Sequence, residues 1–215
     1  MKINKKSKIF IAGHNGMVGS AIKRKFEIKG FKNIITINKK KLNLLDQRKV
    51  LKFLKRKKPQ AVILAAAKVG GIIANSLYKS KFLYENLQIQ NNLIHGSYNA
   101  GVKNLIFLGS SCIYPKFSKQ PIKEKYLLTG KLEETNDAYA IAKIAGMMMC
   151  KNYSENYGLN YKCLIPANLY GPNDNYNLQN SHYFPALIRK IDQAKTLNKK
   201  TVKVLGTGKV LRELL

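Results

Sequence analysis

A tyrosine and a lysine stand four residues apart in an otherwise apolar segment, "NDAYAIAKIAGMMMC" (residues 136–150). If this segment is a helix, the side chains of Tyr139 and Lys143 lie on one face of it. An ammonium beside a phenol favours the phenolate, so we expect the pKa of Tyr139 to fall from about 10 toward neutrality. Such a tyrosine can exchange a proton with a sugar hydroxyl or carbonyl. The alternative is a core tyrosine beside a lysine whose ammonium reaches solvent.

Three glycines spaced three apart lie close to the N-terminus. The apolar segment "KIFIAG" (8–13) predicts a strand, and "VGSAIKRKFEIKG" (18–30) has the amphipathic pattern of a helix. Gly13, Gly16 and Gly19 lie at the turn between them. Glycines there let the backbone approach a pyrophosphate, and the helix N-terminus supplies N–H groups and a positive dipole. The pattern predicts a dinucleotide site, although glycines also make strand–helix turns that bind nothing.

The residues after the second predicted strand bear on the choice of cofactor. The segment "NIITIN" (33–38) is followed by Lys39 and two further lysines. NAD sites place Asp or Glu at this strand end to bind the ribose 2′-hydroxyl, whereas NADP sites lack the carboxylate and add a cation. We therefore expect NADP, used as NADPH, with Lys39 as the cation.

A group of small polar residues follows the fourth predicted strand, "NLIFLGSS" (104–111). The strand ends in Ser110 and Ser111, and Cys112 comes next. The carboxyl ends of strands are where open α/β sheets bind ligands. We therefore expect Ser110 at the same edge of the sheet as the glycine turn, which favours a chemical role for Tyr139 and Lys143.

The elements that carry these residues alternate along the chain. Strands that alternate with helices predict a doubly wound parallel α/β sheet, here an NAD(P)-binding Rossmann fold. We expect an NADP-binding domain over residues 1–170 and the start of a smaller substrate-binding domain, incomplete, over residues 171–215. Strands are expected at 8–13, 33–38, 59–67, 104–111, 160–168 and 201–206, helices at 18–30, 44–58, 80–100, 136–150 and 186–195, and a polar surface loop at 116–134.

Composition restricts the class of protein. Of 215 residues 45% are hydrophobic, yet no apolar run approaches the roughly 20 residues that cross a membrane. The segment "IFIAG" is shorter than a signal-peptide core of roughly 7–15 residues, so we expect a cytoplasmic protein without a membrane partner. The charge of +28 comes from lysines spread over the whole length with few arginines, which does not favour a nucleic-acid partner. Cys112, Cys150 and Cys163 show no CxxC spacing, so neither a disulfide framework nor a metal site is expected.

Six segments together resemble the GDP-L-fucose synthases, a family within the extended short-chain dehydrogenase/reductases. The glycine turn and the Tyr-x-x-x-Lys pair are shared by the whole superfamily, whereas "GSSCIYP" and "NSHYFPAL" are much more specific. The resemblance covers essentially the whole chain. The segments are "AGHNGMVGSAI", "LAAAKVGGI", "FLGSSCIYPK", "YAIAKIAG", "NLYGPNDN" and "NSHYFPAL".

The resemblance implies an NADPH-dependent enzyme that acts on GDP-4-keto-6-deoxy-D-mannose. In that family the tyrosine and lysine that match Tyr139 and Lys143 serve reduction, and the serine that matches Ser110 polarises the substrate oxygen. The residues that match Cys112 and His182 serve epimerisation at C3 and C5, whose hydrogens are acidified by the 4-keto group between them. A thiol and an imidazole suit this work because both can titrate near neutral pH.

The resemblance also implies the residues that contact the cofactor and the substrate nucleotide. The family often has an arginine in the glycine turn, where this chain has Asn15, so Lys39 is left as the candidate for the 2′-phosphate. Substrate contacts fall on Lys190, Leu205 and Arg212, of which the first two replace a family arginine and tryptophan. Cofactor contacts fall on Gly13, His14, Asn15, Gly16, Met17, Val18, Gly19, Lys39, Leu108, Gly109, Ser110, Ser111, Lys143, Pro166, Ala167, Asn168, Leu169 and His182.

Two alternatives stay open. One is another sugar-nucleotide epimerase or dehydratase of the same fold, although such a dehydratase site has Thr and an acidic pair where this chain has Ser110, Ser111 and Cys112. The other is an inactive nucleotide-binding fragment, because relatives run on beyond "LRELL", and we expect poor turnover from the 215-residue chain. A homodimer is expected through the apolar helices at 80–100 and 136–150.

Overall fold

The computed structural model describes residues 3–204, 206 and 214–215. Its centre is one five-stranded sheet in which every neighbouring pair of strands is parallel. The strand order β2-β1-β3-β4-β5 places β1 between β2 and β3, so the chain runs outward to both sides of β1. This confirms the predicted doubly wound parallel α/β fold. The strands are β1 (Ile9–Ala12), β2 (Ile34–Ile35), β3 (Ala61–Leu64), β4 (Asn104–Leu108) and β5 (Asn160–Leu164).

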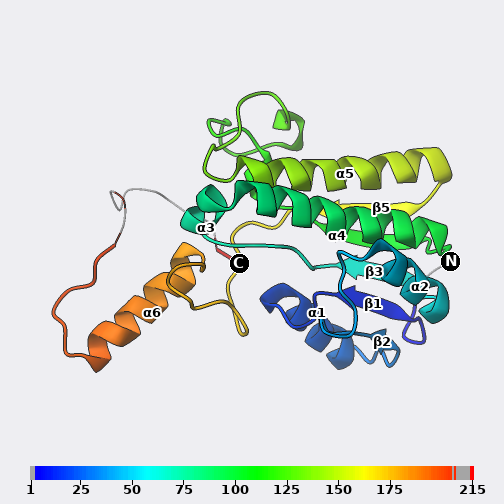
Figure 1. Cartoon of the computed structure of the whole chain (residues 1–215), viewed down its shortest axis with the longest axis horizontal. Helices are drawn as coiled ribbons and strands as arrows, with labels where there is room; N and C mark the ends of the chain where they lie inside the picture. The colour runs from blue at the N-terminus through cyan, green and yellow to red at the C-terminus, as the bar shows by residue number, and fades with distance from the viewer. Residues whose placement is uncertain (1–2, 205, 207–213) are drawn as a thin grey trace.

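Helices connect the strands and cover the sheet (Figure 1). On one face α2, α4 and α5 pack together, and α4 contacts both of the others. On the opposite face α1 packs with Ile22 and Phe26 against Ile9, Ile11 and Ile63. The helices are α1 (Met17–Ile28), α2 (Gln47–Lys57), α3 (Ile72–Leu77), α4 (Lys79–Asn99), α5 (Asp137–Tyr157) and α6 (Tyr183–Thr196), and two short 3-10 helices are η1 (Ser111–Ile113) and η2 (Glu124–Tyr126).

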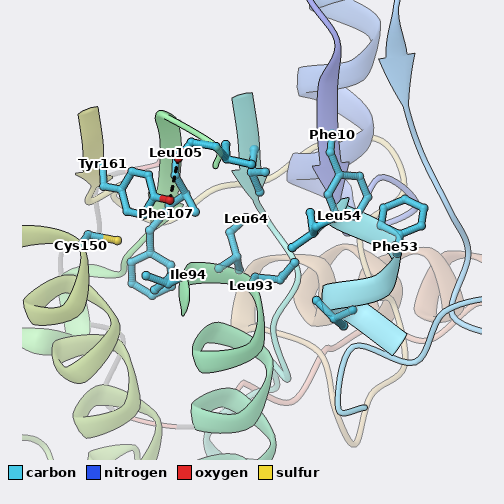
Figure 2. Packing of buried hydrophobic residues seen from close by; sticks show 14 of the residues in the cluster. Phe10, Phe53, Leu54, Leu64, Leu93, Ile94, Leu105, Phe107, Cys150 and Tyr161 are labelled. Atoms are coloured by element: carbon cyan, nitrogen blue, oxygen red, sulfur yellow. Dashed lines mark hydrogen bonds between the residues drawn. The ribbon is translucent and has the colours of Figure 1, made fainter. Parts of the chain in front are cut away.

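The main hydrophobic core lies between the sheet and the layer formed by α2, α4 and α5 (Figure 2). Alternate residues of a strand point to opposite faces, so Phe10 joins this core while its neighbours Ile9 and Ile11 face α1. The rings of Phe10 and Phe53 lie 4.9 Å apart. Each fully buried side chain of this size contributes about 1.5–3 kcal/mol to stability. The core therefore fixes the sheet edge at which the candidate site is built.

Several predicted boundaries move in the structure, and one predicted strand is wrong. Helix α2 begins only at Gln47, because the Asp46 side chain caps it by accepting the Lys49 N–H at 2.9 Å. Helix α5 runs to Tyr157 and ends at Gly158, which takes the left-handed conformation (φ 60°). Residues 201–204 form no strand, since the strands of the described chain give them no partner, and Leu205 lies outside the described residues. The short helix α3 was not predicted.

None of the helices in the described part of the chain is both long enough and apolar enough to span a membrane. The predicted division into two domains at residue 170 stays a prediction.

Candidate active site

The residues after β4 form a tight turn at the carboxyl edge of the sheet. A Cβ atom on Gly109 would lie 3.1 Å from Cys163 Sγ, so a larger residue would push against the β5 side chain there. Ser110 then caps η1. Its hydroxyl oxygen accepts a hydrogen bond from the backbone nitrogen of Cys112, 3.5 Å away. The capping contact fixes the Ser110 side chain and places the Cys112 thiol beside it.

Lys143 projects from α5 into this turn. Its Nζ atom donates to the carbonyl oxygen of Leu108 at 2.7 Å and lies 4.7 Å from the ring centroid of Phe107. The residue is only 4% exposed, and burial lowers the pKa of Lys143 to about 8, against the opposing effect of the Cys112 and Cys163 thiols. A buried ammonium needs such partners, and here a carbonyl and an aromatic face supply them. The predicted alternative, a lysine whose ammonium reaches solvent, is wrong.

Tyr139 lies one helical turn before Lys143, and the Lys143 Nζ atom is 5.6 Å from the centroid of the phenol ring. The expected fall in its pKa is wrong for this structure. Burial, reinforced by the Cys112 thiol, raises the pKa of Tyr139 well above its ordinary value, and the contact with the Ser110 hydroxyl opposes the rise only in part. The buried phenol is therefore protonated across the neutral range, ready to donate a proton.

The Cys112 thiol is also protonated near neutral pH. Burial raises the pKa of Cys112, although the Ser110 hydroxyl and the Lys143 ammonium both favour the thiolate. The expectation that this thiol titrates near neutrality is wrong for the same reason as for Tyr139: desolvation exceeds the effect of the nearby cation. A protonated thiol can donate a proton, and Cys112 could act as a base only after it loses this proton.

The glycine turn after β1 has the geometry of a phosphate cradle. Gly13 has φ +90°, and a Cβ on it would lie 2.6 Å from the Ala66 backbone nitrogen. A Cβ on Gly19 would lie 2.1 Å from the Gly13 carbonyl oxygen. Gly16 is the N-cap of α1 without any side-chain cap, so the first N–H groups of the helix are left for an anion.

The other predicted cofactor residues lie around the same edge. His14, Asn15, Met17 and Val18 belong to the glycine turn and the first turn of α1, and burial together with Lys23 lowers the pKa of His14. Pro166, Ala167, Asn168 and Leu169 follow the carboxyl end of β5. Lys39 is exposed and lies four residues after the end of β2. The strand β2 is shorter than predicted.

The predicted substrate residues are less closely gathered. His182 is the N-cap of α6 and is exposed, and among the described residues no hydrogen bond or ion pair joins it to Cys112. Lys190 Nζ donates to the Lys203 carbonyl oxygen at 3.0 Å, so in this structure it holds the chain after α6. Leu205 and Arg212 lie outside the described residues.

Two buried polar side chains of α4 were missed by the sequence analysis. The Asn86 side chain accepts from the Lys68 N–H at 2.8 Å and donates to the Lys68 carbonyl at 3.0 Å, which fixes the loop after β3. Gln90 donates to the Ala142 carbonyl at 2.6 Å, directly beside Lys143 in α5. Polar residues on the apolar face of a predicted helix were the signal that could have revealed them.

A glycine turn before α1 and a Ser–Tyr–Lys group at the end of β4 place the chain in the class of dinucleotide-binding α/β proteins. The family model described as "NAD dependent epimerase/dehydratase family" matches residues 9–215, so the chain belongs to this family.

Individual relatives refine the comparison and confirm the resemblance noted in the sequence. GDP-L-fucose synthase from Escherichia coli (strain K12) is 50% identical over 210 residues, which cover 98% of this chain and 65% of that protein. The solved structure of a GDP-mannoheptose C4 reductase from Campylobacter jejuni with NADP bound has a TM-score of 0.92 at 41% identity, covering all of this chain (100%) and 70% of that one. GDP-L-fucose synthetase from Naegleria fowleri bound to NADP has a TM-score of 0.88 at 31% identity, with 100% and 70% covered. The chain spans 65–66% of the length of the first curated relatives it matches.

Proposed function

We propose that the protein is a GDP-L-fucose synthase. It converts GDP-4-keto-6-deoxy-D-mannose to GDP-L-fucose by epimerisation at C3 and C5 followed by reduction of the 4-keto group with NADPH. The observation that carries the proposal is the convergence of Ser110, Cys112, Tyr139 and Lys143 at the end of β4. The 50% identity to the Escherichia coli enzyme over nearly the whole chain supports it.

The cofactor NADPH fits the carboxyl edge of the sheet. The glycine turn offers a backbone cradle and the uncapped N-terminus of α1 for the pyrophosphate, with Gly13, Gly16 and Gly19 as its frame. Lys39 supplies the charge for the 2′-phosphate, and Lys143 donates to the nicotinamide ribose. When bound, NADPH supplies the hydride that reduces C4.

Reduction needs a proton on the oxygen of C4. Tyr139 provides it, because burial keeps its phenol protonated, and the Ser110 hydroxyl polarises the same oxygen by a hydrogen bond. Lys143 holds the group together through Leu108 and stabilises the phenolate that is left after proton transfer.

Epimerisation needs two groups on opposite faces of the sugar. The 4-keto group acidifies the hydrogens at C3 and C5, one group removes such a proton, and a second group returns a proton to the other face. Cys112 and His182 are the pair that we assign to this step. Cys112 lies beside Ser110, so it reaches the carbons next to the polarised carbonyl.

A second candidate function is a GDP-sugar C4 reductase that does not epimerise. The raised pKa of Cys112 favours it, because a thiol that keeps its proton is a poor base. The similarity to the GDP-mannoheptose C4 reductase supports the same alternative.

The proposal also covers the substrate-binding domain, the cellular location and the oligomeric state. We assign residues 171–215 to a substrate-binding domain, in which Lys190, Leu205 and Arg212 contact the GDP moiety. The protein acts in the cytoplasm as a homodimer. Tyr84 on α4 and Ile141 on α5, 63% and 49% exposed, belong to the helices through which the two copies pair.

The deciding experiment follows deuterium from solvent into GDP-4-keto-6-deoxymannose in the presence and absence of NADPH. Wash-in at C3 and C5 without NADPH, followed by reduction when NADPH is added, supports the synthase. Reduction without wash-in supports the C4 reductase. Binding of NADPH with neither reaction would leave a nucleotide-binding protein and contradict both candidates.

A further inference from the structure

The segment that carries His182 packs directly on the loop between β3 and α3. The Gly71 N–H donates to the Asn180 carbonyl oxygen at 3.0 Å. A Cβ atom on Gly71 would lie 2.2 Å from the Ser181 carbonyl oxygen and 4.0 Å from the His182 nitrogen. Only glycine therefore lets the two backbones meet here. In Figure 1 the start of α6 lies next to α3, as these contacts require.

Asn75 fixes the orientation of this loop. Its side chain is 7% exposed, and its Nδ2 atom donates to the carbonyl oxygens of Gly70 at 2.6 Å and Gly71 at 3.1 Å. Its own N–H also donates to the Gly71 carbonyl at 3.0 Å. With their carbonyls held by one side chain, these peptide planes cannot turn freely, so the Gly71 N–H stays directed at Asn180.

The loop is anchored to α4 at both of its ends. At its start, Asn86 binds both the N–H and the carbonyl of Lys68. Near its end, a Cβ on Gly70 would meet the Phe82 ring at 3.0 Å, and Phe82 is 1% exposed. Contacts thus run without a break from the buried face of α4 to the backbone of His182.

Among the described residues, the junction leaves two buried polar atoms without a protein partner. Asn75 Oδ1 and Ser181 Oγ are both buried and, within the part of the chain that the structure describes, neither has a hydrogen-bond partner. A buried polar atom without a partner costs about 1–3 kcal/mol. One backbone hydrogen bond and close packing hold the segment, so a single added methyl group suffices to displace it.

We propose that Gly71 and Asn75 are positioning residues for His182. The His182 side chain makes no capping hydrogen bond to α6. The position of its imidazole therefore depends on the backbone at Ser181. By holding that backbone, Gly71 and Asn75 present the imidazole to the sugar carbon that it protonates or deprotonates. This inference rests on the proposed function, in which His182 moves protons.

The first test measures the junction without activity. Gly71→Ala and Asn75→Asp are compared with wild type by hydrogen–deuterium exchange of the backbone. Asn75→Asp keeps the side-chain shape but can donate to at most one of the two carbonyls, so it serves if Gly71→Ala does not fold. We expect amides of residues 177–182 to exchange about tenfold faster, equal to about 1.4 kcal/mol. The control is Ser76→Ala on the same helix, an exposed hydroxyl whose contact with the Thr135 carbonyl is 3.5 Å long.

The second test measures coupling to His182. We expect Gly71→Ala and Asn75→Asp to slow wash-in by about tenfold (about 1.4 kcal/mol) at the carbon that depends on His182, and to leave the NADPH dissociation constant within about twofold. In a His182→Gln background the same changes should cause no further loss, because the group they position is gone.

Each outcome decides the inference. Unchanged amide exchange in both variants would overturn it, and so would losses that add in full to that of His182→Gln. Faster amide exchange with no further loss in the His182→Gln background supports it. A wild-type protein without any wash-in would remove the proposed function alone, and the amide exchange would still decide whether Gly71 and Asn75 hold this segment.

Discussion

The ammonium of Lys143 is bound to the carbonyl oxygen of Leu108, 2.7 Å away, at the point where β4 leaves the sheet. This bond ties the middle of α5 to the turn that carries Ser110. It also holds the ammonium in a largely buried position, and burial lowers the pKa of Lys143 to about 8. The site thus keeps a charge that costs stability, in return for an ammonium beside Tyr139.

This cost predicts a pH dependence of stability. The unfolded chain holds the Lys143 proton up to its ordinary pKa of 10.5, whereas the folded chain loses it from about 8, so the unfolded state binds more protons between these values. Stability of the wild type should therefore rise with pH across this window, relative to Lys143→Met, by about 3 kcal/mol in the free energy of unfolding. Below pH 8 the full cost in stability of burying the Lys143 ammonium is present, and above pH 10.5 this cost has disappeared. Urea unfolding from pH 7 to 11 measures it.

The matched control for this prediction is Lys151→Met, an exposed lysine on the same helix. We expect the difference between this control and wild type to stay nearly constant over the same pH range. A Lys143→Met difference that does not narrow with rising pH would show that the ammonium is not buried in solution.

Removing the Tyr139 hydroxyl should separate the two chemical steps. Tyr139→Phe keeps the ring near Lys143, so the fold and the NADPH affinity should hold. Without the phenol proton we expect reduction to fall at least about a hundredfold, equal to about 2.7 kcal/mol. Wash-in of deuterium at C3 and C5 should persist, because Cys112 and His182 serve it. Tyr84→Phe, on the exposed face of α4, is the control, and loss of wash-in with normal reduction would reverse the assignment.

The fold could be predicted from the sequence because its signals are local and repeated. The run Ile9–Ala12 is apolar throughout, and all four residues are buried, as expected for a strand covered on both faces. Boundaries were less accurate because they depend on single contacts, such as the Asp46 cap of α2. The pattern "TVKVL" alternates like a strand, but a strand also needs a neighbouring strand. The sequence of the segment alone does not tell whether such a neighbour is present.

The structure brings together several residues predicted for the site, but their electrostatics differ from the prediction. Ser110 follows the carboxyl end of β4, and α5 packs against β4 and η1, so Tyr139 and Lys143 reach the same place from the helix. Proximity to Lys143 suggested a low pKa for Tyr139, and the role implied by the resemblance suggested that Cys112 titrates near neutral pH. Burial raises the pKa of both groups. Burial depends on packing from the whole fold, so spacing along a helix cannot supply it.

Cofactor choice should depend on Lys39. We expect tighter binding of NADPH than of NADH, and Lys39→Ala should weaken NADPH alone by about three- to fivefold, since an exposed ion pair contributes about 1 kcal/mol or less. The control is Lys40→Ala, because Lys40 is the next residue and is also exposed. Titration of both cofactors by nicotinamide fluorescence measures the six dissociation constants of the three proteins. Equal or tighter binding of NADH by the wild type would contradict the prediction.

Two glycines of the cradle should respond differently to the same added methyl group. In Gly19→Ala the Cβ would lie 2.1 Å from the Gly13 carbonyl oxygen, so we expect a loss of about 1–3 kcal/mol of stability together with NADPH binding. In Gly16→Ala, among the described residues other than its chain neighbours, the new Cβ would meet only the Gly13 carbonyl oxygen within 4 Å, at an ordinary 3.5 Å. Gly16→Ala should therefore fold as stably as wild type and still bind NADPH more weakly. Thermal unfolding with and without NADPH distinguishes the two, and full affinity in Gly16→Ala would place the pyrophosphate elsewhere.

The proposed homodimer can be tested on α4 and α5 without disturbing the core. Met147 and Met149 pack against the main core, so charges there would report on folding rather than on association. Tyr84 and Ile141 are better positions, being 63% and 49% exposed. We expect Tyr84→Glu with Ile141→Glu to give a folded monomer whose melting temperature does not depend on protein concentration. The new carboxylates of one copy would face those of the other across a two-fold interface and prevent pairing. Light scattering at micromolar concentration measures the mass. The control is Ile28→Glu at the end of α1, 78% exposed and away from both helices, which should remain a dimer. A wild-type monomer, or a dimer that tolerates both charges, would place the interface elsewhere or remove it.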